Sequence, residues 1–268
     1  MPHACIEDKI TETLTRKPWY RQLFFAFTGR FDLKNWIIKR EFKRWVRKKK
    51  PAQPKVLDVG FGLGQHVYMV NKSLPNAHIL GLDVSAKAVA CVNRYFNHLK
   101  HPHIYCKCKD ITEFEGNQSF DLVMAFKLLN YIEDDKQAIK RMFQALKPGG
   151  TLLILNSYSA QFQDTILEDP VHSLPLFRAG YTMESLRDML KEAGFSTVKC
   201  RYIYGPSGQL AWKLGIGWPL KWLNKSYLLL PIVALYTLLI WPLVWILNYY
   251  EMHVGHTSGH SLFLSAEK

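Results

Sequence analysis

The chain has 268 residues, 48% of them hydrophobic, and carries 35 Lys and Arg against 22 Asp and Glu, a net charge of +13. This length accommodates one large α/β domain and leaves about 60–80 residues for additional segments. A basic surface suits nucleic acid or an anionic membrane, and composition alone does not choose between these partners.

Cysteine usage and the first residues bear on the compartment. Five cysteines are scattered along the chain: Cys5, Cys91, Cys106, Cys108 and Cys200. Only one pair is closely spaced and no second pair accompanies it, so metal-site spacing is absent. An odd number of scattered cysteines is typical of free thiols in a reducing compartment. The first residues contain no apolar run of signal-peptide length. We therefore expect no metal and a cytoplasmic catalytic domain.

Residues 1–50 are predicted to form a basic, helical N-terminal segment, with 14 Lys and Arg against 5 Asp and Glu. An aromatic cluster at 19–27 is followed by a predicted break at 28–32. Over 33–46, apolar residues recur at helical spacing beside a strongly basic face. This helix either packs on the domain with a solvated charged face or contacts lipid headgroups. The prolines of the linker 48–54 end the helix.

Between residues 55 and 204, short apolar runs alternate with helical segments, the pattern of a parallel sheet covered on both faces. Strands are predicted at 55–60, 78–83, 103–108, 120–126, 151–156 and 196–204. Helices are predicted at 65–73, 86–99, 111–117, 134–146 and 182–194.

The first strand runs directly into a glycine-rich turn that opens a helix. Its glycines, which allow sharp bends and a close approach of ligand to backbone, are Gly60, Gly62 and Gly64. The residue three after Gly62 is Gln65, so the dinucleotide fingerprint G-x-G-x-x-G is excluded. The second strand ends in Asp83, about 20 residues past the loop, beside the crevice of a doubly wound sheet. A carboxylate there can accept hydrogen bonds from a ribose diol.

An acidic residue followed by G-x-G-x-G, here beginning at Asp58, resembles motif I of the class I S-adenosylmethionine (SAM) methyltransferases. Further matches in order are Asp83, Asp110 after the third strand, 120–125 and 146–154. The resemblance covers roughly 54–204 plus a last strand at 260–266. It implies an α/β, Rossmann-like class I methyltransferase fold: a mainly parallel seven-stranded sheet with an antiparallel last strand, and helices on both faces.

The resemblance also implies a cofactor, SAM, with S-adenosyl-L-homocysteine as product. Asp58 and the glycine loop would hold the methionine moiety, Asp83 the ribose, and Asp110 with Ile111 the adenine. The cofactor-binding positions carried over are Asp58, Gly60, Gly62, Gly64, Asp83, Val84, Asp110, Ile111 and Lys127.

Candidate catalytic residues follow the fourth and fifth strands, where relatives line the active site and shape acceptor pockets. They are Asn130, Tyr131, Tyr158 and His172. Asn130 equally fits a helix-start or turn role, and no family motif assigns a general base. His253, His256 and His260 are spaced by three and four residues, but we favour surface or headgroup-binding roles over a metal site.

The most unusual stretch is 227–250, which has 24 residues and no charge. It is long enough to span a bilayer, and Trp and Tyr near its ends resemble interfacial aromatic belts. A buried helix pair in a dimer is the alternative, and we favour the membrane. Strands 196–204 and 260–266 must share one sheet on one side of the bilayer. The segment therefore either dips in and returns, broken near Pro231 or Pro242, or lies in the interface.

Four parts are thus expected: the segment 1–50, a SAM-binding core at 54–205, a membrane-associating insertion at 206–258 and the final strand at 259–268. The favoured function is methyl transfer to a lipophilic, membrane-resident acceptor (a lipid, quinone precursor or long-chain phenol or acid) at the cytoplasmic face of a membrane. Contact with lipid is expected through 210–250 and basic 30–50. The alternative is an enzyme or binding module for RNA or protein that uses the basic N-terminus.

Overall fold

The computed structural model describes residues 18–159 and 175–268, which belong to two compact units. The first unit contains the described part of Met1–Gln22 together with Pro51–Arg201 and Leu262–Lys268. The second unit contains Leu23–Lys50 and Tyr202–Ser261.

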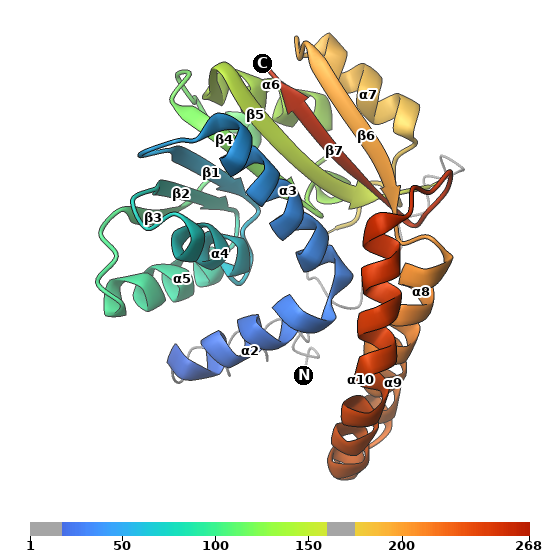
Figure 1. Ribbon diagram of the computed structural model, residues 1–268. Coiled ribbons are helices and arrows are strands. Elements are labelled where there is room, and N and C mark those ends of the chain that lie inside the picture. Colours follow the sequence, from blue (N-terminus) through green and yellow to red (C-terminus); the bar gives the residue numbers. More distant parts are fainter. Residues whose placement is uncertain (1–17, 160–174) are drawn as a thin grey trace. The chain divides into compact units, whose positions relative to one another are not determined.

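The first unit is built on a seven-stranded sheet with the strand order β3-β2-β1-β4-β5-β7-β6 (Figure 1). The strands are β1 (Lys55–Val59), β2 (His78–Asp83), β3 (Ile104–Cys108), β4 (Phe120–Phe126), β5 (Leu146–Ser157), β6 (Thr197–Ile203) and β7 (Ser261–Glu267). The first five strands are parallel, and the register places Asp58 of β1 between Gly81 and Met124. The predicted fold class is confirmed.

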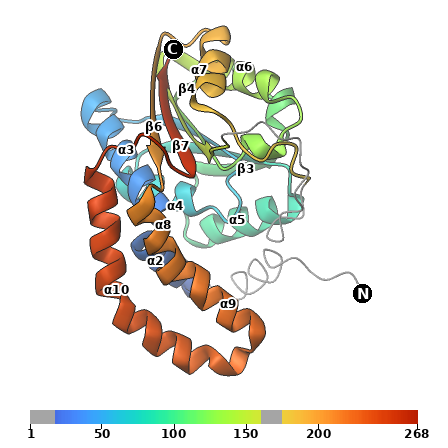
Figure 2. The same cartoon turned by 90° about the vertical axis from the view of Figure 1, so that its right-hand side faces the viewer.

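Four helices cover this sheet: α4 (Gln65–Ser73), α5 (Ala86–His98), α6 (Asp135–Ala145) and α7 (Met183–Glu192). Because the chain winds outward from β1 in one direction and from β4 in the other, α4 and α5 lie on one face and α6 and α7 on the other (Figures 1 and 2). Ser85 caps α5 by accepting from the Ala88 amide, as predicted. The helix predicted at 111–117 is shorter, a 3₁₀ turn at Ile111–Glu113 whose N-cap is Asp110.

The last strand β7 is antiparallel to both of its neighbours. The Ser196 amide donates to the Glu267 carbonyl at one end of β6, and the His260 amide donates to the Tyr204 carbonyl at the other. On the other side, the Gly149 amide at the start of β5 donates to the Lys268 carbonyl. The expected pairing of 196–204 with 260–266 is therefore confirmed, and β6 joins the described sheet through β7.

Two N-terminal helices, α2 (Pro18–Phe31) and α3 (Leu33–Lys49), are separated by the single residue Asp32. The predicted break at 28–32 therefore contains the observed one but is too long. Thr28 lies inside α2, where its hydroxyl donates to the Phe24 carbonyl, so its hydrogen-bonding capacity is met within the helix. Asp32 is the N-cap of α3, with Oδ1 accepting from the Lys34 amide at 3.0 Å.

Residues 206–253 form a helical hairpin in the second unit (Figure 2). The first arm is α8 (Pro206–Trp212), a π-helical turn (Lys213–Gly217) and α9 (Trp218–Lys225); a 3₁₀ turn (Tyr227–Leu229) leads into the second arm, α10 (Leu230–His253). The arms approach closely because Gly215 has no side chain, and a Cβ there would lie 3.2 Å from Val244. Of the two predicted break points, Pro231 lies in the first turn of α10, directly after the turn at which the chain reverses. A break at Pro242 is contradicted, because the helix continues through it.

Candidate cofactor and acceptor site

The glycine loop lies between β1 and α4, at the carboxyl end of the sheet. Gly60, Gly62 and Gly64 have φ of +68°, +52° and +79°, a region that favours glycine. A Cβ on Gly60 would lie 2.7 Å from Leu128 Cδ1, so a side chain there would force Leu128 to shift. A Cβ on Gly62 would meet nothing within 4 Å. Gly62 therefore faces open space, where a ligand can approach the backbone.

Asp83 at the end of β2 holds this loop in place. Its Oδ2 accepts from the Gly62 amide at 2.9 Å, and its Oδ1 accepts from the Ser85 amide at 2.9 Å. The residue is partly exposed. Because each carboxylate oxygen can accept two hydrogen bonds, Asp83 retains acceptor capacity for a ribose diol. The residue thus shapes the loop and stays partly exposed beside it.

Asp58, on β1 just before the loop, is buried, with 1% of its surface exposed. Its Oδ2 has no hydrogen-bond partner among the described residues. Burial, and secondarily the nearby Asp83, raise the pKa of the Asp58 carboxyl well above its usual value. An orphaned polar oxygen is costly unless a ligand or water satisfies it. Together with the open space at Gly62, it fits a polar cofactor at this loop.

Three of the remaining predicted cofactor positions lie at the ends of β2 and β3, and the fourth, Lys127, directly follows β4. Asp110 Oδ1 accepts from the Thr112 amide at 2.7 Å and from its hydroxyl at 2.8 Å. The Ile111 side chain is buried beneath this turn, whereas Val84 is 49% exposed and offers an apolar surface. The fold therefore brings the β1, β2 and β3 ends to one edge, as the sequence indicated.

The segment after β4 carries Lys127, Asn130 and Tyr131. Lys127 has a left-handed φ of +58°, and its Nζ donates to Ser157 Oγ at 3.2 Å. Asn130 is buried, and its Nδ2 donates to the Arg178 carbonyl at 2.7 Å. The Asn130 carbonyl accepts from the Phe177 and Arg178 amides. Asn130 thus ties the segment after β4 to residues 177–178, and its buried Oδ1 has no partner among the described residues.

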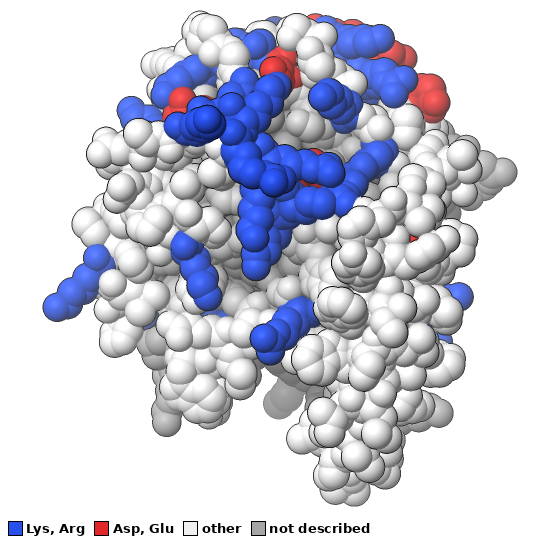
Figure 3. All heavy atoms as spheres, in the orientation of Figure 1, with Lys and Arg blue, Asp and Glu red and all other residues white. Residues whose placement is uncertain are grey.

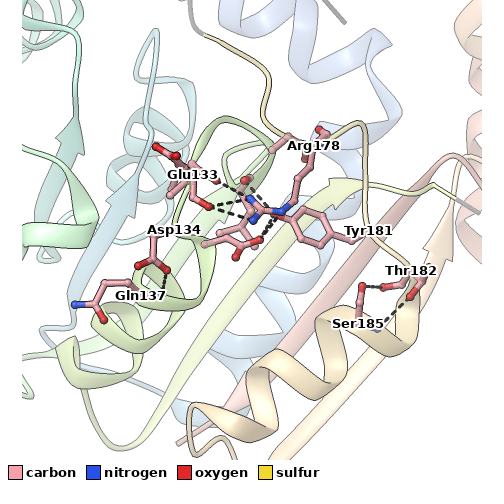
Figure 4. A network of polar contacts seen from close by, with 11 residues as sticks. Glu133, Asp134, Gln137, Arg178, Tyr181, Thr182 and Ser185 are labelled. Atoms are coloured by element: carbon pink, nitrogen blue, oxygen red, sulfur yellow. Dashed lines mark hydrogen bonds and ion pairs between the residues drawn. The ribbon is translucent and has the colours of Figure 1, made fainter. Parts of the chain in front are cut away.

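A buried network that the sequence did not reveal fixes this segment (Figure 4). The Tyr181 hydroxyl donates to Asp135 Oδ2 at 2.7 Å, and Arg178 Nε lies 3.2 Å from the same oxygen. Arg178 also donates to the carbonyls of Ile132 and Glu133. Burial and the Asp135 carboxylate raise the pKa of Tyr181 above its usual value. The network ties the residues after β4 to the chain that approaches α7.

Tyr158 lies beside this network, at the end of β5. It forms an isolated bridge with Tyr181 and is partly exposed. His172 lies outside the described residues. Within 18–159 and 175–268, no three His, Cys, Asp or Glu side chains group closely enough to hold a metal ion.

Comparison with known proteins also points to a methyltransferase domain. Residues 56–150 match a family model described as a methyltransferase domain. Phosphoethanolamine N-methyltransferase 2 of Caenorhabditis elegans is 31% identical over 154 residues, 55% of this chain and 33% of the relative. A ubiquinone/menaquinone biosynthesis C-methyltransferase of Desulfotalea psychrophila is 26% identical over 150 residues, 54% of this chain and 60% of the relative. The chain thus spans between a third and 60% of these two curated relatives.

Solved structures share the fold. Haemonchus contortus phosphoethanolamine N-methyltransferase 2 in complex with SAM has a TM-score of 0.57 at 20% identity, covering 97% of this chain and 60% of that chain. The [4+2]-cyclase SpnF has a TM-score of 0.56 at 21% identity, covering 86% and 80%. The fold alone therefore does not fix the reaction. The ordered motifs, the seven-stranded sheet and the family match together show a methyltransferase domain around residues 56–150, with the fold of the class I SAM-dependent enzymes.

Proposed function

We propose that the protein is an enzyme that transfers a methyl group from SAM to a lipophilic, membrane-resident acceptor. The cofactor assignment rests on the loop geometry: Gly62 faces open space, its amide donates to the partly exposed Asp83, and Asp58 just before the loop has a buried oxygen without a partner among the described residues. Relatives that share this region include the phosphoethanolamine N-methyltransferase named above, which supports methyl transfer as the reaction class.

Bound SAM would supply a methyl group that its sulfonium already activates for in-line displacement. The protein's task is then to align the acceptor and, for a hydroxyl or phenol, to remove a proton. Asp83 would accept from the ribose, and the backbone at Gly62 would lie against the methionine moiety. Tyr131 and Tyr158 remain candidates for contact with the acceptor, because both follow strands at this edge and both are partly exposed.

The lipophilic acceptor is inferred from α10. The helix has 24 residues, its most apolar 18-residue window has a mean hydropathy of 2.2, and only 11% of that window is buried. A large exposed apolar surface marks an interaction site. A lipophilic acceptor in a membrane would explain why the enzyme exposes this helix, whereas a water-soluble acceptor would not. The relatives' names differ in the atom methylated, with an N-methyltransferase and a C-methyltransferase among them.

A second candidate, action on RNA or protein, draws on α3. Lys and Arg side chains gather over this helix (Figure 3). Its exposed basic residues are Lys39, Lys43, Arg44, Arg47 and Lys48. We favour lipid because the basic helix and the exposed apolar α10 belong to the same unit, and an anionic membrane surface accounts for both.

The test begins with calorimetry of SAM and S-adenosyl-L-homocysteine on the full chain. Labelled SAM is then offered with lipid extract, with RNA and with a protein extract. Transfer to a lipid-soluble product, identified by mass spectrometry, is expected. Absence of SAM binding would remove the enzyme assignment, and label in RNA or protein alone would move the function to the second candidate.

A further inference from the structure

The second arm of the hairpin presents a continuous apolar stripe to solvent. Leu235, Leu239 and Ile246 are 60%, 72% and 57% exposed. The stripe follows one helical face and consists of Ile232, Leu235, Leu239, Leu243, Ile246 and Tyr250. An exposed apolar surface of this length marks an interaction site rather than ordinary surface variation.

This stripe is not the packing face of the hairpin. That face lies elsewhere on α10, where Val244 packs with Ala211 and Leu214 of the first arm. Tyr236 also points inward, and its hydroxyl donates to the Leu214 carbonyl at 3.1 Å. The two arms therefore pack through a different face of α10, and the exposed stripe is available to contact another partner.

The two ends of the hairpin are joined by a buried carboxylate. Glu251 is the one acidic residue in 206–253, and its side chain is 1% exposed. Its oxygens accept from the Gly205 amide at 2.7 Å, the Gly208 amide at 2.9 Å and the Ser207 hydroxyl at 2.5 Å. These donors belong to the N-terminus of α8, where a carboxylate is favoured. The entry and exit of the hairpin are therefore fixed side by side.

We propose that the hairpin 206–253 lies in the plane of one leaflet of an anionic membrane and does not cross it. This inference deepens the proposed function and rests on its lipophilic acceptor. The partner is a bilayer because the stripe is uncharged over its length, while exposed Trp212, Trp218 and Trp245 flank it, as aromatic residues do at headgroup depth.

The joined ends argue against crossing. Because Gly205 and Glu251 are held together and the arms pack along each other, α10 could cross only if the first arm crossed with it. The first arm carries exposed Lys213 and Lys221, and a Lys at the bilayer centre is costly. In the plane of the leaflet, both side chains reach the headgroups.

Charge on the same unit selects anionic lipid. Exposed Lys43 and Arg47 lie on the basic side of α3, and each basic residue near such a surface adds attraction. The chain at the N-terminus of α3 is held next to the hairpin: Tyr204, just before α8, donates to the N-cap Asp32 at 2.8 Å, and Asn248 of α10 donates to the Phe31 carbonyl at 3.3 Å. Stripe and basic helix would therefore engage one surface together.

The first experiment measures co-sedimentation of the full chain with vesicles of phosphatidylcholine containing phosphatidylserine. The double variant Leu239→Asp/Ile246→Asp should bind at least about tenfold more weakly, because two exposed anchors are lost. The matched control is Tyr105→Ser, which removes a side chain of similar exposure (56%) from β3 in the other unit. The control should bind as the wild type does. Equal vesicle binding by the wild type and the double variant would overturn the proposal.

A second arm tests charge and oligomeric state. Lys43→Ala/Arg47→Ala should weaken binding to anionic vesicles, by about fivefold for each charge removed, and leave weak binding to pure phosphatidylcholine unchanged. Light scattering without lipid tests a second copy as the occupant: a wild-type dimer that Leu239→Asp converts to a monomer would overturn the membrane assignment.

Topology and cofactor binding are measured on the same preparations. The variant Leu239→Cys is added to the outside of sealed vesicles that contain a membrane-impermeant thiol reagent. The cysteine at position 239 should react with this reagent only after detergent has opened the vesicles. Reaction in sealed vesicles would show crossing and contradict the in-plane arrangement. All variants should bind SAM as the wild type does. Loss of SAM binding in the wild type would remove the proposed function but leave the vesicle result standing.

Discussion

The amide of Gly62 donates to Oδ2 of Asp83 at 2.9 Å, so the carboxylate at the end of β2 holds the loop at the end of β1. The other oxygen accepts from the Ser85 amide at the start of α5. One side chain therefore sets both the loop position and the helix entry. The site is organised before any cofactor arrives, which lowers the cost of ordering on binding.

Replacing Asp83 separates these roles. Asp83→Ala should weaken SAM binding by about 1.5–3 kcal/mol, because a charge-assisted acceptor for the ribose is lost. Asp83→Asn keeps one acceptor oxygen and should lose less. Calorimetry checks both variants, with thermal unfolding run in parallel to detect damage to the loop. Unchanged affinity in a folded Asp83→Ala protein would remove the residue from the cofactor site.

The two loop glycines give a matched pair. Gly62→Ala meets no atom within 4 Å and should leave the fold intact while weakening SAM binding, through strain at φ +52° and obstruction of the ligand. Gly60→Ala collides with Leu128 and should lower the melting temperature as well. Larger substitutions such as Gly60→Val and Gly62→Val should abolish binding. Normal SAM affinity in Gly62→Ala and Gly62→Val would make the loop purely structural.

Asp58 predicts a pH dependence of stability. Its pKa is raised in the native state, so the unfolded chain ionises first as pH rises from about 4, and the free energy of unfolding falls until the native pKa is passed. Asp58→Asn cannot ionise. Its stability relative to wild type should therefore grow as pH rises through this window. Urea unfolding at a series of pH values measures the difference, and a difference independent of pH contradicts the assignment.

Tyr181→Phe tests the network after β4. Loss of the hydroxyl removes hydrogen bonds to Asp135 and to the Leu129 carbonyl, and should cost about 1–3 kcal/mol of unfolding free energy. Tyr158→Phe is the control, since Tyr158 is only partly buried and is a candidate for acceptor contact. It should change turnover more than stability. A loss of stability in Tyr158→Phe together with a loss of turnover in Tyr181→Phe would contradict these assignments.

Local patterns predicted the sheet well. The strand at 78–83 and the helix at 65–73 have the predicted bounds, because apolar periodicity and the glycine loop define them within short windows. The Asp135–Arg178–Tyr181 network could not be predicted in this way. Arg178 and Tyr181 follow Asp135 by 43 and 46 residues, and no sequence motif links the three. The continuity of α10 through Pro242 was missed because packing by the first arm outweighs the local cost of proline.

The position of β7 has a consequence for biogenesis. In the described sheet, β6 touches β7 alone, and β7 follows the hairpin in the sequence. A ribosome therefore delivers the apolar hairpin before the strand that attaches β6 to the rest of the sheet. During that interval the half-built sheet exposes an unpaired edge on β5, and the hairpin is free to find lipid. Closure of the catalytic sheet then becomes the last step, completed only by the strand that follows the hairpin.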